Sequence, residues 1–180
     1  MTTTRSWRTT SKNMTESANL RSRLSLGPRR KAREFALLGV YESLINESAD
    51  FAAIDANLLS VITDEGSPVA GCDLSSEDFD HCDQEFYRDI LDGVIKGKEE
   101  LLETLSRHLD RDPQRLSVVE RACLMIGTWE MKNCPQIPYR VVINEAVELC
   151  KVFGADRGYK LVNGVLDKVA SELRPAEHEA

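Results

Sequence analysis

The stretch of sequence that decides the fold is IPYRVVINEAVELCKVFGADRGYKLVNGVLDKV, residues 137–169. In its first half, apolar residues recur at three- and four-residue steps from Val142 through Ala146 to Phe153, as they do on one face of an amphipathic helix. The second half repeats the pattern from Leu161 to Val169. The stretch therefore predicts an antiparallel pair of helices whose apolar faces lie in a core.

A polar turn, GADRGYK (residues 154–160), joins the two predicted helices. We expect Gly154 to end the first helix in the left-handed conformation and Asp156 to cap the second. Arg157 and Lys160 then lie beside exposed backbone N–H groups, where a phosphate can bind. Gly164 interrupts the second helix at a cost of about 1 kcal/mol, which close backbone packing or the approach of a ligand would offset.

Helical periodicity recurs through the rest of the chain, and no alternation typical of strands is present. Helices are predicted over residues 29–45, after Asp50, over 84–109 and over 118–131. Gly93 and Gly97 predict tight packing or a bend in the third, and Ser117 with Glu120 predicts a capping box for the fourth. Residues 63–82, rich in acids, Gly, Pro and Ser, predict a loop. The fold class is therefore all-α, a compact bundle of six to seven helices.

The 180 residues fit one domain with two tails. We expect residues 1–27 to be a disordered, basic, Ser/Thr-rich tail, residues 28–174 to form the domain and residues 175–180 to be a polar tail. Met14 offers an alternative translation start to Met1. No run of apolar residues predicts a membrane span, and five cysteines without a secretory signal indicate reduced thiols in the cytoplasm.

The charges are unevenly distributed along the chain. Residues 1–33 hold nine Lys or Arg against one acid, whereas residues 34–100 hold three against seventeen, and the net charge is −7. A basic segment on an acidic body indicates a localised site for a polyanion. Four cations within residues 29–33 crowd a helix N-terminus, where the helix dipole disfavours them, so a bound phosphate would offset an unfavourable arrangement.

Catalysis finds little support in the sequence. The three histidines (residues 81, 108 and 178) have no companion residues for nucleophilic chemistry, and no glycine-rich phosphate-binding motif is present. Cys72, His81 and Cys82 match no standard zinc spacing. We therefore expect no catalytic residue, no metal and no cofactor, and interpret the chain as a binding module rather than an enzyme.

Residues 137–169 closely resemble the C-terminal signature of the NusB family of transcription antitermination factors, with Leu161 where that family usually has Phe. RRKAREFALLGVY (residues 29–41) and VVERACLMIGTWEM (residues 118–131) resemble two further family segments. The resemblance implies two packed helical subdomains that pair with the ribosomal protein NusE. It further implies that the pair binds boxA RNA in nascent ribosomal RNA transcripts, within an RNA polymerase antitermination complex.

The resemblance also implies roles for individual residues. It predicts RNA contacts for six cations: Arg29, Arg30, Lys31, Arg33, Arg157 and Lys160. It places Tyr41 and Glu120 at the NusE interface, although for Glu120 a plain capping role is an alternative. Two other functions stay open: a NusB-like domain that serves ribosomal RNA modification, and a free storage homodimer. No methyltransferase domain follows within these residues, which favours antitermination.

Overall fold

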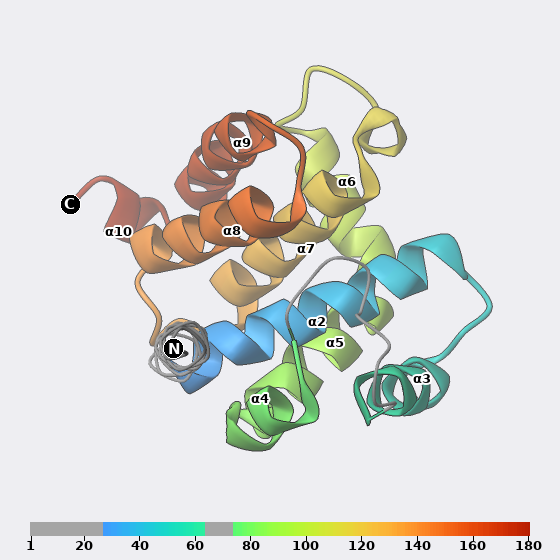
Figure 1. The fold of residues 1–180 in the computed structure, drawn as a ribbon. Helices are drawn as coiled ribbons and strands as arrows, with labels where there is room; N and C mark the ends of the chain where they lie inside the picture. The colour runs from blue at the N-terminus through green and yellow to red at the C-terminus, as the bar shows by residue number, and fades with distance from the viewer. Residues whose placement is uncertain (1–26, 64–73) are drawn as a thin grey trace, which may run out of the picture.

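The computed structural model of the protein describes residues 27–63 and 74–180 (Figure 1). In this part of the chain every regular element is helical, which confirms the predicted all-α fold. None of these helices is both long enough and apolar enough to cross a membrane. Of the tail predicted for residues 1–27, residues 1–26 lie outside the described part of the chain. The helices are α2 (Pro28–Ile45), α3 (Phe51–Thr63), α4 (Ser76–His81), α5 (Gln84–Lys96), α6 (Lys98–Ser106), α7 (Val118–Asn133), α8 (Tyr139–Phe153), α9 (Gly158–Leu173) and α10 (Pro175–His178), with a 3-10 turn at Pro113–Arg115.

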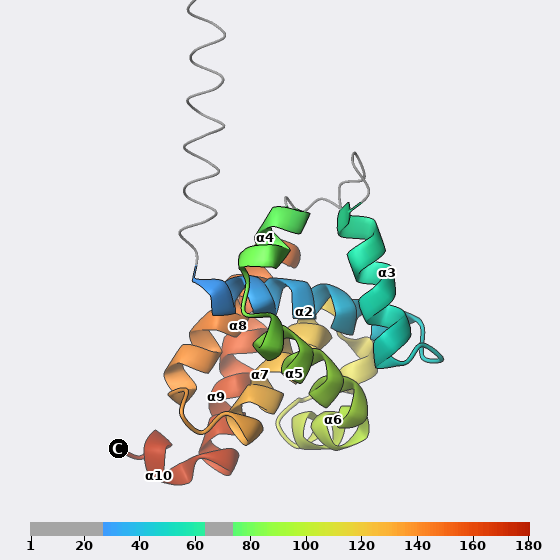
Figure 2. The same ribbon diagram turned by 90° about the horizontal axis from the view of Figure 1, so that it is seen from below.

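Helix α7 lies at the centre of the fold. The predicted pair of α8 and α9 packs against one side of α7, and α2 and α5 pack against another (Figures 1 and 2). The apolar faces of these helices meet in one core, in which Phe35, Leu124 and Leu166 are fully buried. Helices α2 to α5 and helices α6 to α9 thus form the two packed groups expected, which meet along α2 and α7.

The single helix predicted for residues 84–109 is two helices, and that prediction was wrong. Gly97 ends α5 and begins α6, with backbone angles of −92° and 9°. Gly93 packs against the indole of Trp129 so closely that a Cβ there would lie 2.1 Å from its Nε1. Of the two glycines, Gly97 therefore provides the bend and Gly93 the tight contact.

The loop predicted for residues 63–82 contains a short helix that the acidic composition concealed. Residues 64–73 lie outside the described part of the chain, but α4 follows at Ser76. Ser75 and Asp78 form a capping box, in which the Ser75 hydroxyl accepts from the Asp78 N–H and the carboxylate of Asp78 accepts from the Ser75 N–H. Asp50 caps α3 by accepting from the Ala53 N–H at 2.9 Å. The capping box predicted for Ser117 and Glu120 at the start of α7 is confirmed.

The turn between α8 and α9 differs from the prediction at two positions, Gly154 and Asp156, and at Gly164 within α9 one of the two predicted reasons for the glycine is absent. Gly154 is extended, not left-handed, with φ −93° and ψ 175°; a Cβ there would lie 2.5 Å from the Cys150 carbonyl oxygen, so close approach requires the glycine. Arg157, not Asp156, occupies the N-cap of α9, with no capping side chain. At Gly164 a Cβ would meet nothing within 4 Å, so close backbone packing does not explain this glycine.

Candidate nucleic-acid interface

The cationic start of α2 follows from Pro28, which begins the helix at a position where its missing N–H costs nothing. The next residue, Arg29, is the most exposed of the four cations in the first turns of α2, with 51% of its side chain accessible. Its Nε lies 3.4 Å from a carboxylate oxygen of Asp83, and its guanidinium lies 5.0 Å from the centre of the Phe86 ring. One face of Arg29 is thus held and the other is open to a phosphate.

Arg30 is tied to helix α8. Its Nε and Nη2 donate to the two carboxylate oxygens of Glu145 at 2.9 and 2.6 Å. This hydrogen bond raises the pKa of Arg30. Burial opposes the ionisation of Glu145, but the hydrogen bond and charge of Arg30, with the charge of Arg33, outweigh it and lower the Glu145 pKa. About a third of the Arg30 side chain stays exposed, so a ligand can reach it beside Glu145.

Lys31 and Arg33 lie inside the protein, a placement that the charge pattern alone did not indicate. Arg33 is 4% exposed and donates from Nε and Nη2 to Glu130 at 2.8 and 2.7 Å. Lys31 is 7% exposed, and its Nζ lies 3.0 Å from a carboxylate oxygen of Glu34. These ion pairs hold α2 in the fold, and the two cations would have to leave them to reach a phosphate. Direct RNA contact by Lys31 and Arg33 stays a prediction.

The turn before α9 presents two exposed cations. Arg157 adopts φ 70°, in the left-handed region of backbone conformation that residues other than glycine rarely occupy. Lys160 follows in the first turn of α9, where its own N–H donates to the Arg157 carbonyl oxygen at 3.1 Å, so the side chain and not this N–H is available to an anion. Neither Arg157 nor Lys160 has an ion-pair partner within residues 27–63 and 74–180. Backbone strain of this kind gathers at functional sites, and the unpaired charges are suited to an anion.

Helix α8 separates the two cationic groups. Arg30 lies beside α8 at Glu145, with which it pairs, whereas the turn begins where α8 ends at Phe153. Eight residues of helix correspond to about 12 Å, so the arginines of α2 and the 155–160 turn are not one patch. Lys151 on α8, which the sequence did not single out, has its Nζ 3.1 Å from Glu148 Oε1 and 5.2 Å from the centre of the Tyr159 ring.

Tyr41 and Glu120, predicted at the protein interface, lie near the same turn. Tyr41 is 40% exposed and borders a hollow of about 210 Å³ with Leu38, Val119 and Phe153. Glu120 completes the capping box of α7 by accepting from Ser117 N–H at 3.1 Å. A Cβ at Gly158 would also lie 2.8 Å from Glu120 Oε1, so Glu120 contacts the turn directly.

Two further large apolar side chains are exposed on the helices that form this hollow. Ile45 on α2 is 60% exposed and Val152 on α8 is 65% exposed, although both belong to helices whose other faces are buried. Large exposed apolar side chains that gather near one site are typical of protein-binding surfaces. The capping role of Glu120 is observed, and the partner-binding role of Tyr41 and Glu120 stays a prediction.

The histidines and cysteines form no metal-binding group in residues 27–63 and 74–180. Cys72 lies outside those ranges. The Nδ1 of His81 lies 2.8 Å from the Glu77 carbonyl oxygen of its own helix, and His108 pairs with Glu172. These contacts account for both rings as parts of the fold.

Comparison with known proteins agrees with this architecture. A model of the NusB family matches residues 30–171. The transcription antitermination protein NusB of Burkholderia lata is 45% identical over 152 residues, which cover 84% of this chain and 94% of that protein. The protein of the same name from Dechloromonas aromatica is 46% identical over 149 residues, which cover 83% and 82%.

Two solved structures share the fold. NusB of T. maritima matches with a TM-score of 0.67 and 25% identity over 85% of this chain and 98% of that one. A structure of the antitermination factors NusB and NusE in complex with dsRNA matches with a TM-score of 0.62 and 21% identity over 79% and 96%. The extent of the family match and the identity to curated relatives together show that this chain belongs to the NusB family.

Proposed function

We propose that this protein is a transcription antitermination factor that binds boxA-type RNA in nascent ribosomal RNA transcripts together with a NusE-type ribosomal protein. The observation that carries the proposal is the turn before α9, where Arg157 and Lys160 are exposed and unpaired within the described residues while Arg157 occupies a strained backbone conformation. Family membership supplies the class of ligand. The protein acts by binding and not by catalysis.

The proposal divides the six predicted cations by their surroundings. Arg29 and Arg30 at one end, and Arg157 and Lys160 at the other, contact the phosphates of a single strand that passes along α8. Lys31 and Arg33, which are buried in ion pairs, position α2 for this contact. Phosphate contacts position the strand, and the bases and 2′-hydroxyls exposed on single-stranded RNA provide specificity.

The ribosomal partner occupies the face that holds Tyr41, Glu120 and the hollow beside Phe153. That hollow is lined by apolar and aromatic side chains (Leu37, Leu38, Tyr41, Val119 and Phe153), and such side chains are typical of the core of a protein-binding surface. Because this face adjoins the 154–158 turn, the bound partner extends the surface available to RNA and strengthens binding by avidity. The complex acts in the cytoplasm with RNA polymerase.

A reconstitution experiment tests the proposal. Fluorescence anisotropy would measure the affinity of the protein for a boxA-containing RNA and for a scrambled RNA of the same composition, each with and without the NusE-type ribosomal protein. We expect tight binding only for the boxA RNA with the partner present. Equal affinity for the two RNAs in the presence of the partner would contradict the proposed function.

The same face allows a homodimer in the free protein, since Tyr41 and Ile45, one helical turn apart on α2, expose apolar surface there. Size-exclusion chromatography with increasing amounts of the ribosomal partner separates the alternatives. A dimer that the partner converts to a heterodimer indicates that both use this face, whereas a dimer that persists in the partner complex indicates a separate dimer surface.

A further inference from the structure

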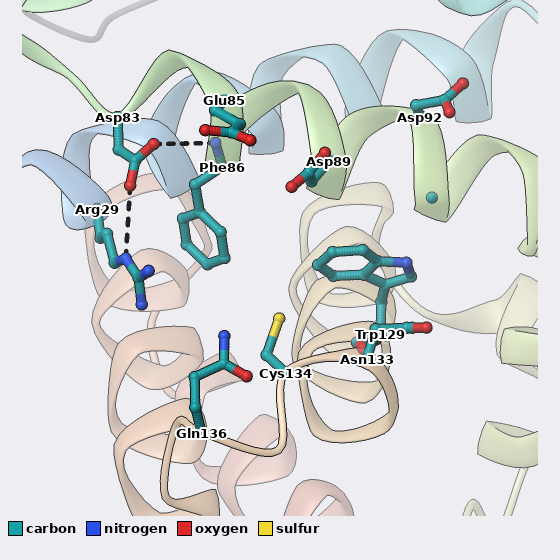
Figure 3. A pocket seen from close by; sticks show the side chains of 11 residues that line it. Arg29, Asp83, Glu85, Phe86, Asp89, Asp92, Trp129, Asn133, Cys134 and Gln136 are labelled. Carbon is teal, nitrogen blue, oxygen red and sulfur yellow. Dashed lines mark hydrogen bonds and ion pairs between the residues drawn. The ribbon is translucent and has the colours of Figure 1, made fainter.

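An acidic groove lies between α5 and the C-terminal end of α7, with Arg29, one of the proposed RNA contacts, at its edge (Figure 3). Its volume is about 480 Å³. Four carboxylates line it along α5, and an aromatic and polar wall faces them from α7 and the segment that follows. The acidic groove comprises Asp83, Glu85, Phe86, Asp89, Asp92, Gly93, Trp129, Asn133, Cys134 and Gln136, with Arg29 at one end.

The charges of the groove are only partly balanced. Asp83 pairs with Arg29, and Asp92 pairs with Lys96 at 2.7 Å. Glu85 and Asp89 have no ion-pair or hydrogen-bonding side-chain partner in residues 27–63 and 74–180. The groove therefore repels RNA and favours a cation.

The aromatic side chains specify what kind of cation fits. Arg29 already shows the geometry, because its guanidinium pairs with Asp83 while lying 5.0 Å from the centre of the Phe86 ring. Trp129 offers a second aromatic surface beside Asp89 (Figure 3). Guanidinium groups combine such stacking with ion pairing better than ammonium groups do. The groove is thus suited to a peptide segment that carries arginines.

One buried polar group also faces the groove without a partner. Cys134 is 6% exposed, and its thiol points toward the groove in Figure 3. The backbone of Cys134 is hydrogen-bonded to Glu130 and Arg174, but its thiol makes no hydrogen bond in the described part of the chain. Burial raises the pKa of this thiol, so it stays protonated and available as a weak donor to a backbone carbonyl of a bound segment.

We propose that the acidic groove binds the arginine-bearing N-terminal segment of the same chain, residues 1–26. That segment holds five Lys or Arg and one acid, opposite in sign to the groove. It joins α2 beside the groove: the N–H of Asp83 donates to the carbonyl oxygen of Pro28 at 3.1 Å. The covalent connection gives the segment an effective concentration of about millimolar at the groove, an advantage that a separate basic protein lacks.

The lengths also agree. Arg23 and Arg21 precede Gly27 by four and six residues, which at about 3.4 Å per extended residue allows reaches of about 14 and 20 Å. The carboxylates from Asp83 to Asp92 extend over nine residues of helix, about 14 Å. Arg21 and Arg23, the two arginines nearest the domain, can therefore reach Asp89. The N-terminal segment would then cover the wall of the groove at Trp129.

Limited proteolysis of the full chain tests this proposal, since trypsin cleaves after exposed arginines. Brief digestion at low ionic strength, followed by mass spectrometry, would give the cleavage rates at Arg21 and Arg23. The variant Glu85→Gln with Asp89→Asn removes the two unpaired carboxylates without breaking an ion pair. We expect this variant to raise both cleavage rates about three- to tenfold. That is the effect of losing the two exposed ion pairs that Arg21 and Arg23 would make with Glu85 and Asp89.

The matched control is Glu99→Gln with Glu179→Gln, which removes two exposed carboxylates that do not line the groove. We expect the control to leave both cleavage rates unchanged, and salt at about 0.5 M to abolish the difference between wild type and the groove variant. Equal cleavage rates in wild type and the groove variant at low salt would overturn the proposal and leave the groove to a different basic segment. The assay contains no RNA, so its outcome is independent of the proposed function.

Discussion

Replacing Arg33 by alanine is expected to lower the free energy of unfolding by about 3–5 kcal/mol, the usual result of removing one partner from a buried ion pair. The residue left behind is Glu130, which is 1% exposed and whose carboxylate accepts both hydrogen bonds from Arg33. The guanidinium also lies 5.1 Å from the centre of the Phe86 ring, and that contact is lost as well. Since the free energy of unfolding of a whole domain is only about 5–15 kcal/mol, the variant should be close to unfolding.

Urea unfolding followed by circular dichroism measures this loss. With a denaturant slope of about 2 kcal/mol per molar urea, the midpoint should fall by about 2 M. The matched variant, Arg33→Met with Glu130→Leu, removes both charges and fills the space with apolar groups. Its stability should lie close to that of wild type or above it, because the cost of desolvating the two charges disappears.

A loss of less than about 1 kcal/mol in Arg33→Ala, the range of exposed ion pairs, would refute this reasoning. In that case Arg33 would be free to bind a phosphate. The doubly substituted variant separates the two roles, since it is folded and lacks the cation. RNA affinity equal to wild type in that variant would assign Arg33 to the fold, whereas a loss of affinity with a reduced salt dependence would assign it to RNA contact.

Three further predictions concern single positions. Gly164→Ala should raise the free energy of unfolding by about 1 kcal/mol, since a Cβ there meets nothing within 4 Å; an unchanged value in urea unfolding would show that the helix is strained at this point. Arg157→Gly should leave stability within about 1 kcal/mol of wild type, because relief of the positive φ offsets the greater freedom of glycine in the unfolded chain, while RNA affinity falls. Arg30 holds the pKa of Glu145 below its ordinary value of 4.5 despite burial. The ionised Glu145 therefore adds to the free energy of unfolding above about pH 4.5, and this stabilisation is lost as the pH falls through the pKa of the folded state. Glu145→Gln should therefore flatten the loss of stability on acidification, and an equal loss in both proteins would contradict this.

The fold was largely predictable because it depends on periodicity. Val142, Ala146 and Phe153 mark a helix face in the sequence, and the same apolar faces form the core of the structure. Boundaries were less predictable, since Gly97 can bend a helix or divide it, and only the packing of both halves decides. Helix α4 was missed because Ser75 and Asp78 form its cap within a run of acids that also suits a loop.

The candidate site was predictable in its residue types and only partly in its geometry. The sequence indicates that Arg30 and Arg33 are cationic but not that Glu145 and Glu130, more than ninety residues away, pair with them. Burial of these partners depends on how α2 packs against α7 and α8, which no local pattern encodes. Arg157 carries no local signal for a positive φ, because glycine is the usual residue there.

The measurement that tests the central claim most directly is the salt dependence of boxA RNA binding, with the ribosomal partner present, in variants of one cation from each group. For single-stranded RNA each phosphate contact contributes about −0.7 to the slope of log K against log salt concentration. We expect Arg29→Gln and Arg157→Gln each to reduce the slope by about 0.7, and the combination by about 1.4, with Lys96→Gln, whose side chain is 74% exposed, unchanged. A slope that stays at the wild-type value in the combined variant would contradict the account.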